Sequence, residues 1–258
     1  MPPIGILAAL HDEIASLLQD MGPDVVTHRI GQRNYHVGVW HGRPCVVVLA
    51  RIGKVAAAAT TVTLIREFGV SAVVFTGLAG AVGSDVKVGD VVVAQSLLQH
   101  DLDARPLFPQ YEVPLLGRSY FHADVSLSGL LAASAREYLA HDMPHEVSPA
   151  LRDALGMQHP KVHCGTVISG DCFVNSPVQL AALQAALPDA LCVEMEGAAV
   201  AQVCHEYEVP CAIVRTISDR ADGTACVDFN RFLSEVASAY SAGILRRFIH
   251  ALIIREPT

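Results

Sequence analysis

Acidic residues follow three of the apolar runs in this sequence, and acids at such positions can transfer protons or hold a polar substrate group. Glu13 follows the first apolar run of the chain. Glu194 and Glu196 end a middle run, and Asp219 directly follows the last one. A carboxylate at the edge of a crevice can act as an acid or a base when its surroundings shift its pKa. Each acid also has a structural explanation, because a carboxylate near a helix N-terminus stabilises that helix.

The two middle acids need not share a role. Met195 separates them, so their side chains lie on one side of an extended chain and on different sides of a helix. The small residues and the apolar stripe at Val200 and Val203 predict that a helix begins here, directly after a strand. One acid can therefore face a ligand while the other supports the junction.

Strands and helices alternate in the predicted elements that carry these acids. Short apolar runs predict buried strands, and apolar residues at helical spacing predict helices. Alternation of this kind favours a single domain (1–258) with three α/β/α layers, in which ligands bind beyond the carboxyl ends of the strands. The strands are expected at 4–10, within 25–50, and at 71–75, 91–94, 162–168, 190–193 and 211–217; the helices are expected at 56–68, 127–139, about 177–187 and 229–254.

Three further segments are not expected to form long regular elements. Residues 76–83 are rich in glycine and alanine and predict a tight loop that a ligand can approach closely, although they match neither the dinucleotide fingerprint nor the P-loop. Residues 104–118 form an apolar, proline-containing segment that is typical of a lid or a subunit contact. Residues 141–160 predict a surface insertion with one short helix near Leu151.

Composition narrows the possible partners. The 258 residues are 52% hydrophobic and 17% charged, with a net charge of −8, so the chain can bury a large core but lacks the basic surface that nucleic acids or anionic membranes require. The seven cysteines show no C-x-x-C spacing, which argues against a zinc site and favours reduced thiols. The N-terminus lacks the basic region of a signal peptide, and no apolar run reaches membrane-spanning length. We expect a soluble, cytoplasmic protein.

Short motifs recur along the chain at Ile4–Ile14, Ile52–Ala57, Thr76-Gly77 with Ala79-Gly80, Val86–Asp90, Ser169–Asp171 with Phe173, Val193–Glu196, Val214-Arg215 and Ile217–Asp219. Taken in order, these motifs resemble the nucleoside phosphorylase/hydrolase superfamily, and within it the 5′-methylthioadenosine/S-adenosylhomocysteine nucleosidases. The resemblance extends from residue 4 to about residue 235, with gaps at 104–118 and 141–160. It implies a central twisted mixed sheet and hydrolysis of the bond between adenine and a 5′-modified ribose, as in methionine salvage, without a cofactor or a metal.

The resemblance also implies the role of each matching residue. Glu13 activates the attacking water, and Asp219, held by Ser218, protonates N7 of the leaving purine. Glu196 binds the ribose hydroxyls above Met195. The base stacks on Phe173 and bonds the backbone of Val174, and the remaining pocket residues are Ile52, Leu78, Ala79 and Gly80. A homodimer is implied, in which the 104–118 segment closes the partner's pocket.

The chemistry of the bond agrees with these roles. Cleavage passes through an oxocarbenium-like state that carboxylates stabilise. Adenine leaves poorly as an anion, so a positioned acid contributes ~10²–10⁴-fold. Asp219 must then keep its proton near neutral pH, which requires a desolvated site, whereas Glu13 must be ionised.

Two departures from the nucleosidase pattern leave alternatives open. Leu78 replaces a serine, and Arg51 replaces a small residue just before Ile52. A guanidinium at 51 could bind a phosphate or a substrate carboxylate, or pair with Asp12. A purine nucleoside phosphorylase, a hydrolase of a related nucleoside such as futalosine, and a nucleoside-binding protein without catalysis are the alternatives. An anionic Glu13 favours water over phosphate as the nucleophile.

Overall fold

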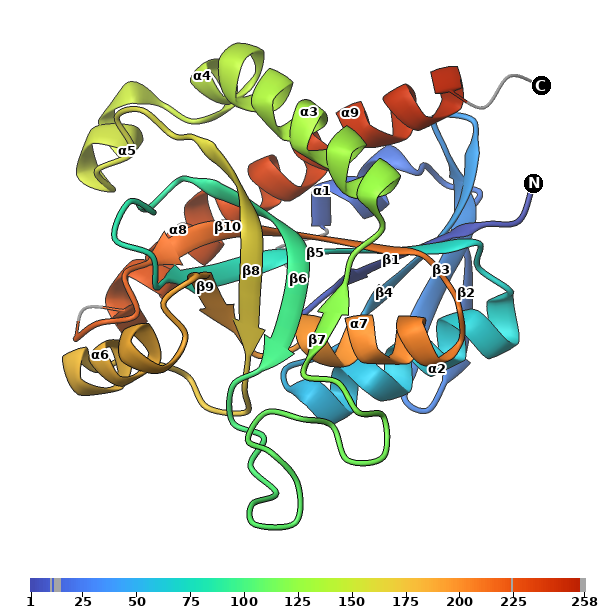
Figure 1. Ribbon diagram of the computed structural model, residues 1–258. Helices are drawn as coiled ribbons and strands as arrows, with labels where there is room; N and C mark the ends of the chain where they lie inside the picture. Colours follow the sequence, from blue (N-terminus) through green and yellow to red (C-terminus); the bar gives the residue numbers. More distant parts are fainter. Residues whose placement is uncertain (10, 12–14, 224, 256–258) are drawn as a thin grey trace.

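The fold is built on one sheet of ten strands flanked by helices (Figure 1). The computed structural model describes residues 1–9, 11, 15–223 and 225–255. The strands are β1 (Ile4–Ala8), β2 (Val26–Ile30), β3 (Arg33–Trp40), β4 (Arg43–Leu49), β5 (Ala72–Ala81), β6 (Val91–Gln99), β7 (Tyr120–His122), β8 (Val162–Ser169), β9 (Ala190–Glu194) and β10 (Cys211–Asp219). The helices are α1 (Ala15–Asp20), α2 (Lys54–Phe68), α3 (Val125–His141), α4 (Met143–Glu146), α5 (Pro149–Ala154), α6 (Pro177–Ala186), α7 (Gly197–Glu206), α8 (Ala225–Glu235) and α9 (Ala237–Arg255).

Alternation along β1 shows how the sheet separates two cores. Ile4 and Ile6 are buried in the core that includes Leu245 of α9, together with residues of α3. Leu7 instead belongs to the core that contains Leu64 of α2, together with residues of α7. Successive side chains of a strand point to opposite faces, so a strand buried on both faces reads as a continuous apolar run. The predicted three-layer α/β/α architecture is confirmed.

The sheet is mixed, as predicted, and β5 is its central strand. β1 pairs with β4 and β5 in parallel, and β10 pairs with β5 in parallel, whereas β9 pairs with β5 in the antiparallel sense. On one edge, β10 follows β5 from Val73 to Gly80. On the other edge, β1 pairs with residues 72–75 and β9 pairs with residues 80–81. Residues 76–79 of β5 therefore lie where β1 and β9 diverge.

The expected loop at 76–83 is wrong over most of its length, because β5 continues through Ala81. The small residues permit this continuation, since β10 remains paired beside them and its end approaches Gly80 closely. The expectation of a single helix over 229–254 is also wrong. The structure has α8 and α9, which are separated at Val236, although the N–H of Val236 still donates to the carbonyl of Phe232 (2.9 Å).

The two proposed insertions differ in structure. Residues 104–118 contain no helix or strand, and they form a loop that extends away from the body of the molecule (Figure 1). Residues 141–160 carry α4 and α5 instead of one short helix. No helix in the described part of the chain is both long enough and apolar enough to cross a membrane.

Candidate functional site

A cavity of about 310 Å³ lies at the ends of β5, β9 and β10, beneath the loop that follows β8. Its walls bring together residues that lie far apart in the sequence, from Ala9 to Phe229, and the predicted site residues among them run from Ile52 to Asp219. All the predicted substrate-binding residues and one of the two predicted catalytic residues line it. They are Ile52, Leu78, Ala79, Gly80, Phe173, Val174, Met195, Glu196, Ser218 and Asp219.

Asp219 is a buried acid in the wall of this cavity, and only 2% of its surface is exposed. Burial raises the pKa of its carboxyl group, and the hydrogen bonds from Ser218 and from the N–H of Ala221 oppose part of that rise. The Ser218 hydroxyl donates to Oδ2 (2.8 Å), and the Ala221 N–H donates to Oδ1 (2.8 Å). The carboxyl group is therefore held in one orientation and favours its protonated form more than an exposed aspartate does.

Gly80 makes the approach of Asp219 to β5 possible. A Cβ at position 80 would lie 2.8 Å from Oδ1 of Asp219 and 3.0 Å from Cβ of Ala221. Real Cβ atoms do not tolerate the shorter contact, so a side chain at this position would displace the acid. A glycine inside a buried strand is ordinarily unfavourable, and this close contact near the end of β5 explains its presence.

Glu194 and Glu196 have different surroundings. Glu194 receives the backbone N–H groups of Glu196 (3.0 Å) and Gly197 (2.8 Å to Oε2) at the start of α7, and it forms a buried ion pair with Arg215 (2.6 Å). The Arg215 guanidinium also lies over the ring of Phe75, 3.9 Å from its centroid. Glu194 thus fixes the junction between β9 and α7, in the manner of a carboxylate at a helix N-terminus.

Glu196 faces the opposite wall of the cavity. Its Oε1 accepts the backbone N–H of Gly53 (2.8 Å), at the start of α2. This bond connects the β9–α7 junction to the turn that carries Ile52. The carboxylate is 5% exposed and lies on the cavity surface.

Phe173 and Val174 cover the cavity from the loop after β8. The ring of Phe173 packs edge-on against Phe229 of α8, with centroids 5.7 Å apart. The loop is tied down by Asp171, whose Oδ1 accepts the N–H of Lys54 (2.8 Å) and whose own N–H donates to Asp101 (2.8 Å). We call the loop 169–175 the roof and the β5 segment 76–80 the floor of the cavity.

Glu13, the other predicted catalytic residue, lies outside the described residues. Five residues that line the cavity were not among those predicted from the sequence. Phe229 was assigned only to a long amphipathic helix, although an aromatic residue on the inner face of that helix was a usable signal. The five are Ala9, Cys172, Val193, Glu194 and Phe229.

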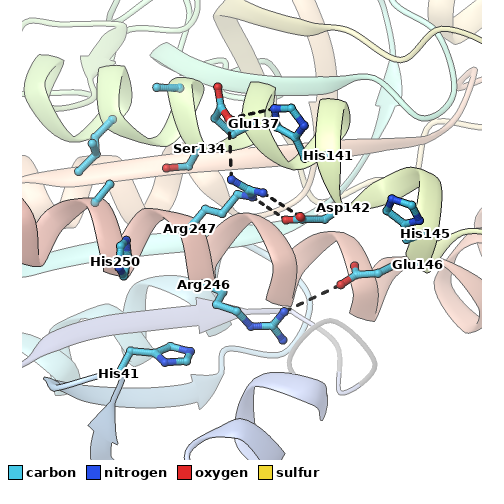
Figure 2. A pocket seen from close by; sticks show the side chains of 13 residues that line it. His41, Ser134, Glu137, His141, Asp142, His145, Glu146, Arg246, Arg247 and His250 are labelled. Carbon is cyan, nitrogen blue, oxygen red and sulfur yellow. Dashed lines mark hydrogen bonds and ion pairs between the residues drawn. The ribbon is translucent and has the colours of Figure 1, made fainter.

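A larger cavity of about 710 Å³ lies between α3, α4 and α9 and contains none of the predicted site residues (Figure 2). Its arginines are matched by carboxylates. Arg247 bonds Asp142 (2.5 Å), and Arg246 approaches Glu146 (3.9 Å) (Figure 2). These pairs explain the charged residues as connections between α9 and its neighbours. Nowhere among the described residues are three or more His, Cys, Asp or Glu side chains arranged to hold a metal ion.

Comparison with known proteins agrees with this architecture. The family profile described as the phosphorylase superfamily matches residues 3–250. The aminodeoxyfutalosine nucleosidase of Helicobacter pylori is 35% identical over 98% of this chain and 100% of its own length. The 5′-methylthioadenosine/S-adenosylhomocysteine nucleosidase of Aeromonas salmonicida is 31% identical over 96% of this chain and 99% of its own length.

A solved structure extends the likeness to three dimensions. The crystal structure of the Helicobacter pylori 5′-methylthioadenosine/S-adenosylhomocysteine nucleosidase with butyl-thio-DADMe-Immucillin-A superposes with a TM-score of 0.82. It is 34% identical and covers 97% of this chain and 98% of the matched chain. With its profile, its relatives and its architecture in agreement, this chain belongs to the phosphorylase superfamily.

Proposed function

We propose that the protein hydrolyses the N-glycosidic bond of a 5′-substituted adenosine, of the methylthioadenosine or adenosylhomocysteine type, and releases adenine. The observation that carries the proposal is the convergence of Asp219, Glu196 and Phe173 on one cavity of about 310 Å³. A buried acid, a sugar-binding carboxylate and an aromatic ring are the groups that this reaction requires. The names of the relatives support the same reaction class.

Asp219 acts as the general acid in this proposal. A raised pKa keeps its proton available near neutral pH, and Ser218 and the Ala221 N–H hold the carboxyl group in place. Proton transfer to N7 lets adenine leave as a neutral base while positive charge develops on the ribose. Glu13 supplies the base that activates water, in keeping with the family resemblance.

The sugar and the base occupy opposite parts of the cavity in this arrangement. Glu196 binds the ribose hydroxyls and Met195 packs under the sugar, while Phe173 stacks on adenine and Val174 offers backbone hydrogen bonds. Ile52, Leu78, Ala79 and Gly80 complete the walls. One catalytic domain, 1–258, contains all these residues.

Hydrolysis is favoured over phosphorolysis by the charge of the cavity. Among its described lining residues there is no lysine or arginine, whereas a phosphorylase needs cationic or backbone donors for phosphate. The carboxylate of Glu196 on the same surface opposes an anionic nucleophile, whereas the charge of Glu194 is balanced by its ion pair with Arg215.

The test is release of adenine from 5′-methylthioadenosine in phosphate-free buffer. We expect turnover without phosphate, and Asp219→Asn lowers kcat by ~10²–10⁴-fold because the isosteric amide cannot protonate N7. Asp142→Asn, which alters an acid in the 710 Å³ cavity, is the matched control and retains activity. Undiminished turnover by the Asp219 variant would exclude it as the acid, and formation of a sugar 1-phosphate would identify a phosphorylase.

We further propose a cytoplasmic homodimer that acts in methionine salvage. The exposed loop 104–118 supports the dimer, because Leu107 and Leu115 are 83% and 91% exposed. Large apolar side chains that are exposed on a loop favour burial against another chain. In this arrangement the loop covers the partner's cavity.

A further inference from the structure

A second cavity, of about 630 Å³, adjoins the proposed site. Ala9 and Ile52 line both cavities, so the two spaces meet at the end of β1 and at the turn between β4 and α2. We call this second space the side cavity. Its other walls come mainly from β3 and the turn before it, with Arg33 and Arg51 among them.

Among the described residues that line the side cavity, two arginines are not balanced by any acid. No aspartate or glutamate is among its described lining residues, and within the described chain neither Arg33 nor Arg51 forms an ion pair. Arg51 Nη2 donates to the carbonyl of Gln32 (2.8 Å), and Arg33 donates to the carbonyls of Ala50 (3.4 Å) and Ala56 (3.4 Å). Carbonyl oxygens satisfy hydrogen bonds but leave the net charge of a guanidinium in place.

Among the described residues, the 710 Å³ cavity and the side cavity differ in whether their arginines face carboxylates. In the 710 Å³ cavity, Arg246 and Arg247 both face carboxylates (Figure 2). Arg33 and Arg51 instead have guanidinium groups that can receive an external anion, for which arginine provides paired N–H donors. The side cavity is therefore suited to an anion, whereas the larger cavity is not.

The backbone at Arg51 supports a role for its side chain. Its φ is 70°, in the left-handed region that non-glycine residues rarely adopt. Glycine or asparagine would satisfy the turn at lower cost, and the resembled nucleosidases carry a small residue here. An arginine in a strained conformation at the boundary of a ligand cavity points to a function for the guanidinium.

The position of the sugar indicates which part of the substrate meets the side cavity. Glu196, the proposed ribose-binding carboxylate, bonds the Gly53 N–H, directly after Ile52. The base, by contrast, is assigned to the end of the site that contains Asp219. The turn at 51–53 thus lies beside the sugar, and a group on the 5′ carbon is the part of the substrate that can pass Ile52.

Resting on the proposed function, we propose that the side cavity receives the 5′ substituent of the nucleoside and that Arg51, with Arg33 beside it, binds a carboxylate at the end of that substituent. The preferred substrate class is then a 5′-substituted adenosine with an anionic terminus. Arg51 is a specificity-determining residue that contacts the substrate away from the bond that breaks.

Matched substrates test this directly. Adenosines with a 5′-thioalkyl chain ending in a carboxylate are compared with the carboxamides of the same chain lengths, by kcat/KM for adenine release. We expect the wild type to prefer the carboxylate by about 10- to 100-fold at the best chain length, the range of a charge-assisted hydrogen bond. Arg51→Asn, which tolerates the left-handed backbone, brings this ratio close to one, and Arg51→Lys restores part of it.

Arg29→Asn is the matched control, because Arg29 is exposed on neighbouring β2 and does not line the side cavity. It leaves the ratio unchanged. Equal rates for carboxylate and carboxamide in the wild type would overturn the proposal. So would an equal loss for both substrates in Arg51→Asn, which would indicate a supporting role such as pairing with Asp12.

Two further measurements distinguish failure of this proposal from failure of the proposed function. Stimulation of turnover by inorganic phosphate that disappears in Arg51→Asn would assign the side cavity to phosphate and overturn the carboxylate. If 5′-methylthioadenosine yields no adenine, the proposed function fails. Calorimetric Kd values for the carboxylate and carboxamide ligands on Asp219→Asn then still decide whether the side cavity selects the anion.

Discussion

At the scale of single residues, the surroundings of Asp219 set both its chemistry and its cost to stability. The side chain is buried against β5, and the pKa of its carboxyl group is raised mainly because burial disfavours the charged form. A group suited to hold a proton for catalysis therefore weakens the fold whenever that proton is lost.

This linkage gives a pH dependence of known sign. Between the unfolded pKa near 3.8 and the raised pKa in the fold, the native state binds more protons than the unfolded state, so the free energy of unfolding falls as pH rises. The contribution is fully present below pH 3.8 and is lost as pH passes the folded pKa. Asp219→Asn has no carboxyl group to titrate and so lacks this pH-dependent stabilisation. Between pH 3.8 and the folded pKa of Asp219, the free energy of unfolding of the variant should therefore rise relative to that of the wild type, by up to about 1.4 kcal/mol per pH unit.

Urea unfolding of both proteins over a pH series measures the difference, and most other titrating groups cancel in the comparison. A constant difference across the acidic range would contradict a raised pKa for Asp219.

Gly80 offers a second test at this scale. Gly80→Ala places a Cβ 2.8 Å from Oδ1 of Asp219, so we expect kcat to fall by at least about tenfold, because misplacement of a catalytic group by 1 Å can cost ~10²-fold. The control is Gly129→Ala in α3, where a Cβ would meet nothing within 4 Å. That variant keeps full activity and gains ~0.5–1 kcal/mol from helix propensity. Adenine release and thermal unfolding measure both effects, and a fully active Gly80 variant would refute the close-approach argument.

At the scale of elements, the roof depends on contacts between α2, the segment that follows β6 and the loop after β8. Lys54 Nζ bonds Asp101 (2.6 Å), and Asp101 in turn accepts the N–H of Asp171 (2.8 Å). Burial alone would raise the pKa of Asp101, but the bonds from Lys54 and Asp171 outweigh it and lower the pKa. The acid is thus held ionised as the link between two elements.

Asp101→Asn should loosen the roof without touching the reacting groups. We expect KM for 5′-methylthioadenosine to rise about tenfold with little change in kcat, because loss of one charge-assisted bond is worth about 1.4 kcal/mol here. Asp103→Asn is the control, since its ion pair with Arg105 is exposed and local. A fall in kcat with KM unchanged would mean that Asp101 acts on the chemistry instead.

The predictability of the fold differs among the elements. The apolar run at 211–217 and the helix at 56–68 were predictable because local pattern alone determines them. The continuation of β5 through 76–81 was not, because it depends on pairing with β10 and β9, which are far away in sequence. The cavity residues carried by motifs were predictable from the resemblance, which also implied a supporting role for Glu194 but did not identify Arg215 as its partner.

For Phe229, the secondary structure was predictable from the sequence but the tertiary contact was not. Its place on a helix was predictable, but its contact with Phe173 arises only when α8 packs beside the roof. The side cavity was equally hidden. The sequence raised the question of Arg51 but could not show that a cavity adjoins it.

At the scale of the whole molecule, the loop 104–118 should determine the oligomeric state. We expect the wild type to be a dimer at micromolar concentration, and Leu107→Glu to shift it toward the monomer with a loss of activity, because burying a charge at an apolar contact is unfavourable. Val178→Glu, at a position on α6 that is 80% exposed, is the control and leaves the dimer intact. Light scattering with chromatography measures the mass. A fully active monomeric wild type would contradict this arrangement.

The pairing of β5 on both of its edges has a consequence for how ligands enter and leave. A strand held by β10 on one edge and by β1 and β9 on the other can separate only when the sheet itself opens, at the full cost of unfolding. The roof, held by side-chain bonds around Asp171, opens at a much lower cost. We therefore expect nucleoside and base to enter and leave on the roof side while the floor stays fixed through each catalytic cycle. Substrate range can then change through the roof and the turn at 51–53, while the strand beneath the reacting bond is left unaltered.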